Sequence, residues 1–499
     1  MSALPATPTL SPAHVTAVLR ILVLSTFVVL LNETIMVNAI PRLMREFDVT
    51  AAAAGWLSTS FMLTMAVVIP VTGWFLQRVT TRTAFSLAMA LFLAGTALAA
   101  AAPVFPVLLA ARVVQAAGTA VMMPLLMTTL MTLVPPHDRG RVMGNITLVI
   151  SVAPALGPAV SGVLLQLGSW RLLFLAVLPI AGAMAVFGRS RLVNIGEPQA
   201  VPIDWVSVPL AAAGFGSLVY GLSGLGAGDA AHTPLSPPVM TLAGAVLVGL
   251  FVWRQMALQR SSTPLLDLRA LTFRHFSVAL ALMCLSFMAL MGAFVLLPIY
   301  LQEVRGLTSL QTGLLLIPGG LTMGLLGPQV GKLYDRFGAP RLVVPGAVLT
   351  ALCLALFALT GEQTSPWLVL ALHVVLSAGM AFVFTPVFTS GLSVLPPHLY
   401  PHGSAILGSL QQVAAAAGTA LVISIMTGHA ATAAAEGAGA TGALATGVRW
   451  GFGIGAVLGA VAVLIALLVR TPPAPPRPAE PEAQDEGGTT LDKTAPTPG

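Results

Sequence analysis

Long apolar stretches recur along most of the chain and are separated by short polar segments. An α-helix needs roughly 20 predominantly apolar residues to cross a bilayer, and we count fourteen such stretches. They lie near residues 17–40, 53–75, 84–102, 106–134, 143–167, 171–189, 205–225, 238–257, 276–301, 309–330, 342–360, 366–394, 403–427 and 448–470. The pattern therefore predicts an all-α polytopic membrane protein with fourteen transmembrane helices.

The second half of this pattern repeats the first. The segment from Ala111 to Gly118 resembles the segment from Leu372 to Gly379, and residues 133–137 resemble residues 394–398. Two further apolar stretches, near 205–257, lie between the copies. We therefore expect two pseudo-symmetric six-helix bundles plus two inserted helices, an architecture that places the substrate site between the halves.

The chain divides into five expected regions, with most of the basic residues on one side of the membrane. The regions are a cytoplasmic N-terminal segment (1–16), an N-terminal six-helix bundle (17–189), two inserted helices with cytoplasmic linkers (190–275), a C-terminal six-helix bundle (276–470) and a disordered cytoplasmic tail (471–499). Seventeen Lys and Arg fall on one side of the pattern and five on the other. Because basic loops stay in the cytoplasm, we expect both termini there and the protein in a bacterial plasma membrane.

The composition supports a bilayer as the solvent of this chain. It is 57% hydrophobic and 8% charged, with a mean hydropathy of +0.92, whereas soluble domains are about a quarter charged. The net charge of +6 comes from scattered residues, not from a basic stripe, so no nucleic-acid partner is expected. Neither a Walker loop nor a metal or catalytic spacing is present, which predicts a non-enzyme without a cofactor or metal. We expect a monomer.

Three ionisable groups lie well inside the predicted spans: Glu33, Arg112 and His373. Buried charges in membranes are costly and usually face the bundle interior, where they have a function. Counting residues from the helix ends places all three at a similar depth, where we expect them to meet. Our hypothesis is that Glu33 binds a coupling proton and Arg112 sets its charge state. A structural ion pair, and for His373 a simple helix contact, are the alternatives.

Five segments carry recognisable motifs: Leu31–Ile35, Gly73–Arg82, Arg112–Gly118, Ala153–Gly162 and Gly331–Arg341. The second and the last resemble a Gly-x-x-x-Asp-Arg-x-Gly loop, the third an Arg-x-x-Gln-Gly helix, and the fourth an antiporter signature rich in Gly and Pro. Together they resemble the major facilitator superfamily, in particular its fourteen-helix drug:proton antiporters. The Asn-Glu-Thr form of the first segment is most similar to exporters of the lincomycin-resistance type.

The resemblance implies a proton-coupled antiporter that exports small lipophilic or amphipathic compounds by alternating access, driven by the proton gradient. Its expected partners are the lipid bilayer, the small-molecule substrate and protons. Two departures affect the site: Gln77 stands where the family loop has Asp, and the carboxylate of Glu33 follows the usual acidic position, which Asn32 occupies. The alternative is an uptake symporter or facilitator for a small nutrient, which we expect to carry more intramembrane charge and no Pro-rich fifth helix.

Gating and substrate residues follow from the motifs and from the polar and flexible side chains within the spans. The predicted gating residues are Gly73, Arg78, Pro154, Gly157, Pro158, Gly331, Asp335 and Arg336. The predicted substrate-cavity residues are Asn32, Asn38, Gln115, Met123, Phe61, Gln411 and Gln412. Methionine repacks around varied ligands, although it is also a common filler of membrane helices. For the loop arginines, membrane topology alone remains an alternative, as does a structural kink for the fifth helix.

Overall fold

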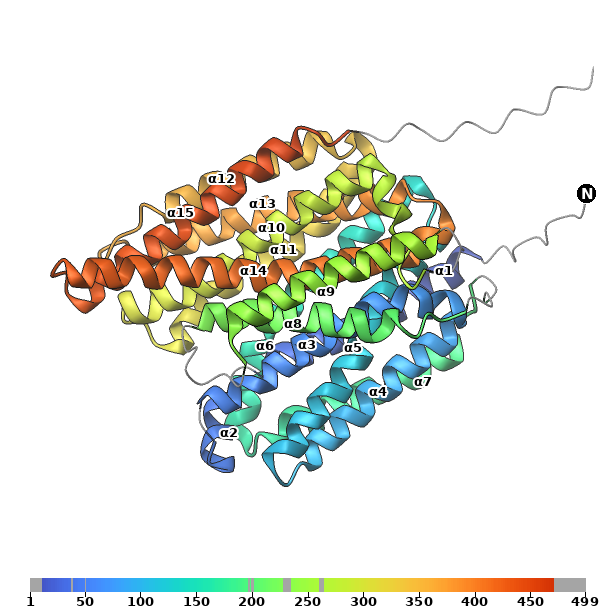
Figure 1. Cartoon of the computed structure of the whole chain (residues 1–499), viewed down its shortest axis with the longest axis horizontal. Helices are drawn as coiled ribbons and strands as arrows, with labels where there is room; N and C mark the ends of the chain where they lie inside the picture. Colours follow the sequence, from blue (N-terminus) through green and yellow to red (C-terminus); the bar gives the residue numbers. More distant parts are fainter. Residues whose placement is uncertain are drawn as a thin grey trace, which may run out of the picture.

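Helices make up the architecture of the protein (Figure 1). The computed structural model describes residues 11–36, 39–49, 51–195, 198, 202–227, 235–259 and 264–470. The helices are α1 (Pro12–Ile35), α2 (Ile40–Phe47), α3 (Ala51–Arg78), α4 (Thr81–Ala101), α5 (Phe105–Leu133), α6 (Arg139–Leu167), α7 (Arg171–Arg191), α8 (Ser207–Ala227), α9 (Pro237–Leu258), α10 (Arg274–Ile299), α11 (Ser309–Phe337), α12 (Pro340–Phe357), α13 (Pro366–Ser393), α14 (Tyr400–Ala435) and α15 (Ala440–Ala466). The short helices η2 (Pro136–Asp138), η5 (Leu268–Thr272), η6 (Tyr300–Val304) and η7 (Pro397–Leu399) lie between them.

The predicted all-α polytopic fold is confirmed. Thirteen helices of the described part are long and apolar enough to cross a membrane, and α6, at 29 residues, is the fourteenth long helix. Burial separates central helices from peripheral ones: in the most apolar window, 72% of α5 is buried but only 17% of α9. A helix that is apolar on all sides and half-covered by protein has its other surface toward lipid.

The two halves of the bundle repeat the same helix packing. In the N-terminal half α1 packs on α6, α3 on α5 and α4 on α7; in the C-terminal half α10 packs on α14, α11 on α13 and α12 on α15. The contacts between the halves are reciprocal, because α6 packs on α11 and α3 on α14. Arg112 and His373 occupy the same position in the repeated helices α5 and α13. The predicted pseudo-symmetry is therefore present in the packing.

The first predicted span, 17–40, is wrong at its C-terminal end. Helix α1 ends at Ile35, and the separate short helix α2 begins at Ile40 with Pro41 in its first turn. Proline suits a helix start and cannot continue a preceding helix, because it lacks the backbone donor. Glu33 consequently lies two residues from the end of α1, not the seven that the longer span implied.

The bundle is closed at one end, which we call the basic face: the loops at 79–80, 134–138, 338–339 and 394–399 with the helix ends that flank them. Near this face the backbones of α6 and α11 touch at Gly140 and Gly331 and again at Gly144 and Gly327. In Figure 1 the N-terminal helices (blue to cyan) and C-terminal helices (yellow to red) diverge away from this end, toward the side that carries α2. The inserted helix α8 packs on α3 and α14, across the junction of the halves.

Candidate transport site

Arg112 is fully buried among the described residues, with an exposed fraction of 1%. Its guanidinium carbon lies 4.2 Å from the centroid of the Phe61 ring, a cation–π contact between α5 and α3. Nη1 donates to Gln115 Oε1 at 2.6 Å, and Nε donates to the Leu57 carbonyl at 3.4 Å. These contacts hold the guanidinium in one place without neutralising its charge.

Gln115 and Phe61 hold Arg112 in place in this structure. Gln115 is fully buried, accepts from Arg112 and donates to Thr96 Oγ1 at 2.7 Å. Phe61 is 1% exposed beneath the guanidinium. In this structure Arg112 occupies the carboxamide oxygen of Gln115 and the ring face of Phe61, and a direct substrate contact stays a prediction for both side chains.

Glu33 is the acidic partner of Arg112 across the α1–α5 contact. The two interact electrostatically, but they form no direct ion pair in the described part of the chain. Glu33 is half-buried, and its neighbour Asn32 is fully buried with both amide atoms lacking a hydrogen-bond partner. Burying an amide without a hydrogen-bond partner costs several kcal/mol by order of magnitude, so Asn32 destabilises this end of α1. A substrate or proton role remains a prediction for both residues.

The signature segment of α6 holds the Glu33 end of α1. Thr34 Oγ1 donates to the Ala153 carbonyl at 3.4 Å, and a Cβ at Gly157 would collide with the Thr34 hydroxyl. Helix α6 runs through Pro154 and Pro158 as one helix, and the Pro158 side chain lies outside the described residues. The small residue at 157 is thus required for contact between α6 and α1.

His373 does not join Glu33 and Arg112 in a contact. Its ring fills the space above Gly319 of α11, within the C-terminal half, and is 9% exposed. Its Nδ1 atom is buried without a hydrogen-bond partner. The expectation that the three ionisable groups meet is therefore not met: repeat symmetry gives equivalent positions in α5 and α13, and equivalent positions lie in opposite halves.

A small cavity lies between the halves, among α3, α5, α13 and α14. Its lining residues are Met65, Ile69, Ala120, Met123, Pro124, Met127, Phe388, Ser404, Leu407, Gly408 and Gln411. Its volume of about 40 Å³ is far below the roughly 300–1,000 Å³ of drug-sized pockets, so a bulky ligand requires side chains to repack. Three methionines make such repacking inexpensive. Of the predicted cavity residues, Met123 and Gln411 line it, Gln412 is half-buried outside it, and Asn38 lies outside the described residues.

Asp335 closes the basic face between the halves. Its Oδ1 and Oδ2 atoms, on α11, accept from the backbone N–H groups of Gly140 and Arg141, each at 2.8 Å, at the N-terminus of α6. A carboxylate there also meets the positive end of the helix dipole. In the other half Gln77, standing where the family motif has Asp, donates to the His398 carbonyl at 2.9 Å.

The arginines of the basic face play unequal parts. Arg78 is exposed, and Arg336 lies 5.0 Å from the ring of Phe337 on its own helix; in the described residues neither reaches the opposite half through a hydrogen bond. Arg139, which the sequence did not single out, is 7% exposed and donates to the Met131 carbonyl at 2.7 Å and to Tyr400 Oη at 3.3 Å. Only burial distinguishes it from the other loop arginines.

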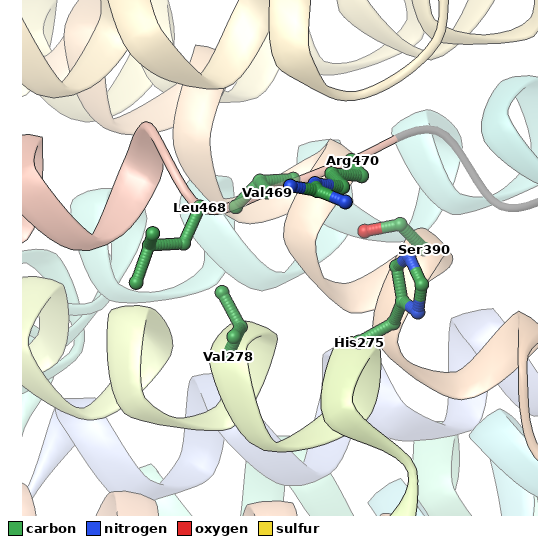
Figure 2. Close-up of a pocket in the computed structure, with 6 residues that line it drawn as sticks. All are labelled: His275, Val278, Ser390, Leu468, Val469 and Arg470. Carbon is green, nitrogen blue, oxygen red and sulfur yellow. The ribbon is translucent and has the colours of Figure 1, made fainter.

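A second pocket lies at the basic face, among the ends of α10, α13 and α15 (Figure 2). Figure 2 shows His275 and Arg470 near Ser390, with Val278 and Leu468 at the apolar end. Its volume of about 10 Å³ is the space of one water molecule, which excludes it as a substrate site. Among the described residues no group of three or more His, Cys, Asp or Glu could hold a metal ion.

Comparisons with known proteins agree with this geometry. The Major Facilitator Superfamily is matched over residues 22–419. An uncharacterized MFS-type transporter of Bacillus subtilis, YcnB, is 39% identical over 466 residues, which cover 93% of this chain and 97% of that protein. The lincomycin resistance protein LmrB of Listeria monocytogenes is 36% identical over 451 residues, covering 89% and 94% of the two chains.

A solved structure supports the same fold at low sequence identity. The proton:xylose symporter XylE, bound to 6-bromo-6-deoxy-D-glucose, superposes with a TM-score of 0.64 over 93% of this chain and 97% of its own, at 15% identity. That likeness concerns the fold alone. The family match covers most of the chain, and both sequence relatives are matched over nearly their full length. This protein is a multi-pass membrane transporter that belongs to the major facilitator superfamily.

Proposed function

We propose that this transporter exports small lipophilic or amphipathic compounds, antibiotics among them, across the bacterial plasma membrane in exchange for protons. The observation that carries the proposal is the carboxylate of Glu33, half-buried in α1 and interacting with Arg112 without a direct ion pair. A carboxyl binds a proton more weakly beside a guanidinium than far from one. A change in the separation of α1 and α5 therefore changes the affinity of Glu33 for a proton.

Alternating access supplies that change in separation. By the positive-inside rule the basic face is cytoplasmic, and the seam there, between α6 and α11, is closed. On this proposal the structure represents the state that faces outward, in which Glu33 takes up a proton from outside. Closure of the outer ends would then move α1 relative to α5, and the contact of Thr34 with Gly157 would carry that movement into α6.

The lining of the small cavity between the halves favours a lipophilic substrate. Its lining contains three methionines, one phenylalanine and a single amide, and none of these lining residues is charged. The lincomycin resistance relative is named for resistance to an antibiotic, which agrees with export. The alternative, proton-coupled uptake, is represented by the xylose symporter of the same fold. A sugar requires many hydrogen-bonding groups, whereas the polar side chains in this lining are Ser404 and Gln411.

The test follows proton movement in energised inside-out vesicles with a pH-sensitive dye. Lincosamides and lipophilic cations are expected to release stored protons from vesicles with the wild-type protein and not from vesicles with Glu33→Gln. Glu46→Gln is the matched control, since Glu46 is an exposed carboxylate of α2 that pairs at 2.7 Å with Arg171 at the start of α7. Equal proton release by wild type and Glu33→Gln would refute the role of Glu33. Xylose-driven release without any drug response would favour uptake.

A further inference from the structure

The linker between the inserted helices and the C-terminal half lies at the basic face, where α3 of the N-terminal half packs on α14 of the C-terminal half. We call the contacts between the two halves at this face, α3 with α14 and α6 with α11, the seam. Leu266 and Asp267, in the segment 264–273 between α9 and α10, are each 3% exposed. The backbone N–H of Asp267 donates to Nδ1 of His402 at 3.2 Å. His402 is itself 3% exposed in the first turn of α14, so this hydrogen bond is sealed from water.

Helix α3 of the N-terminal half forms the third side of this junction. A Cβ at Gly73 would lie 2.7 Å from His402 Nδ1 and 3.3 Å from Leu266 Cδ1. Any side chain at position 73 would therefore displace the imidazole or the linker. The N-terminal half, the C-terminal half and the linker meet around one nitrogen atom.

The same linker is hydrogen-bonded to both inserted helices. The Leu266 N–H donates to Gln255 Oε1 of α9 at 3.1 Å, and Gln255 Nε2 donates to Ser207 Oγ of α8 at 2.7 Å. Ser207 in turn donates to Asp204, which pairs with Arg254 through two contacts of 2.7 Å. A continuous polar chain thus connects the inserted pair α8–α9 to the seam between the halves.

We propose that His402 is a proton-binding site that controls the seam at the basic face. The imidazole accepts the Asp267 N–H only while Nδ1 carries no proton, because an imidazolium has two donors and no acceptor. Protonation makes the Nδ1–H of His402 face the backbone N–H of Asp267 and adds a charge to a buried site. The linker then leaves His402, and α3 separates from α14.

The charged groups around His402 do not stabilise its protonated form enough to offset its burial. The groups that act on it are Asp267, Arg269 and His398. Although burial opposes the ionisation of Asp267, hydrogen bonds from Arg269 hold the pKa of the Asp267 carboxyl below its usual range. Arg269 Nε lies 3.0 and 2.9 Å from the two Asp267 oxygens, so that carboxylate is already neutralised. Helix α8 and residues 69–77 of α3 contain no Asp, Glu, Lys, Arg or His.

The inference goes beyond the proposed export reaction and rests only on its alternating access. If the basic face is cytoplasmic, protons that accumulate inside favour the inward-open state. The inserted helices then have a role, since their linker is the part that the proton releases. This device differs from the Glu33 site, because it lies at the seam and senses the other side of the membrane.

Distances across the seam test this directly. Spin labels at Thr83→Cys in α4 and Pro397→Cys in η7, both exposed, are introduced into the full chain with Cys284 and Cys353 replaced by serine. Double electron–electron resonance in lipid nanodiscs then measures the open-to-closed ratio. Between pH 8 and pH 5, a window that brackets the ordinary histidine pKa, we expect this ratio to rise about tenfold. His402→Asn retains an acceptor oxygen without a titrating group and is expected to stay closed throughout.

Control variants distinguish the titration of His402 from denaturation of the protein at low pH. His398→Asn replaces an exposed histidine one turn away, keeps the carbonyl that Gln77 contacts and should respond to pH like the wild type. His402→Ala removes the acceptor and should be open at every pH; if His402→Asn does not fold, His402→Gln takes its place. A pH response that survives in the His402→Asn or His402→Gln variant, or its absence in the wild type, overturns the proposal. The measurement needs no substrate, so a failure of drug–proton exchange leaves it intact.

Discussion

Replacing Asp335 with asparagine should weaken the closure of the basic face. Both carboxylate oxygens accept backbone N–H groups of the opposite half, at Gly140 and Arg141, each at 2.8 Å. The asparagine side chain would offer one acceptor oxygen in place of two, and its amide group would face the second N–H as a donor. The change is confined to the seam, because Asp335 lies in the last turn of α11.

The magnitude follows from two losses. A hydrogen bond to a charged group contributes about 1.5–3 kcal/mol, and an anion at a helix N-terminus about 0.3–1 kcal/mol. Because the site is partly open to water, we take the lower part of each range, about 2 kcal/mol in total. That free energy corresponds to a change of about 30-fold in the ratio of open to closed seams.

The assay is the distance between spin labels at Thr132→Cys in α5 and Arg341→Cys in α12, exposed positions on opposite halves. The cysteine-free parent should give mainly the short distance, and Asp335→Asn should add a second, longer population. Lys332→Gln is the matched control, since it removes one charge from an exposed position of the same helix. A distance distribution for Asp335→Asn identical to that of the control would refute the reasoning that this carboxylate holds the seam closed.

Two further predictions concern the α1–α6 contact and the inserted helices. Gly157→Val should abolish drug-driven proton release, because a side chain there collides with Thr34 at a cost of about 1–3 kcal/mol; Gly162→Val, with no atom within 4 Å of its Cβ position, should transport normally. Hydrogen bonds from Arg254 lower the pKa of Asp204 to about 2, so this pair stabilises the fold above about pH 4 and loses its effect as the pH falls from about 4 to 2. Arg254→Gln should therefore lower the melting temperature in detergent by about 2 °C at pH 7 and by much less near pH 2; an equal difference at both pH values would contradict the pairing.

Apolar run length and internal repetition predicted most of the fold. The spans near 106–134 and 366–394 differ from α5 and α13 by one residue at each end at most. The error at the end of α1 has a local cause: residues 36–40 are nearly as apolar as the span before them, so hydropathy could not show where the chain turns into α2.

The sequence also identified chemically important residues without assigning their contacts. It selected Glu33 and Arg112, because ionisable groups inside apolar spans are rare and costly. The sequence could not show that Gln115 and Phe61 contact Arg112. The first contact lies within α5 and the second joins α5 to α3, so both depend on the three-dimensional packing. His402 stood out in no way along the chain, because its importance comes from burial beside Gly73 and Asp267, which lie far from it in sequence.

What the sequence by itself determined is the membrane-spanning all-α fold, its repeat and its family, because hydropathy and motifs are properties of short segments. What only the tertiary structure decided is which face is closed and which side chains close it. Asp335 contacts the N-terminus of α6 almost two hundred residues away, and His402 meets a linker more than a hundred residues before it. Such contacts depend on how two bundles dock. A pseudo-symmetric sequence is compatible with docking at either end, and packing selects one of them.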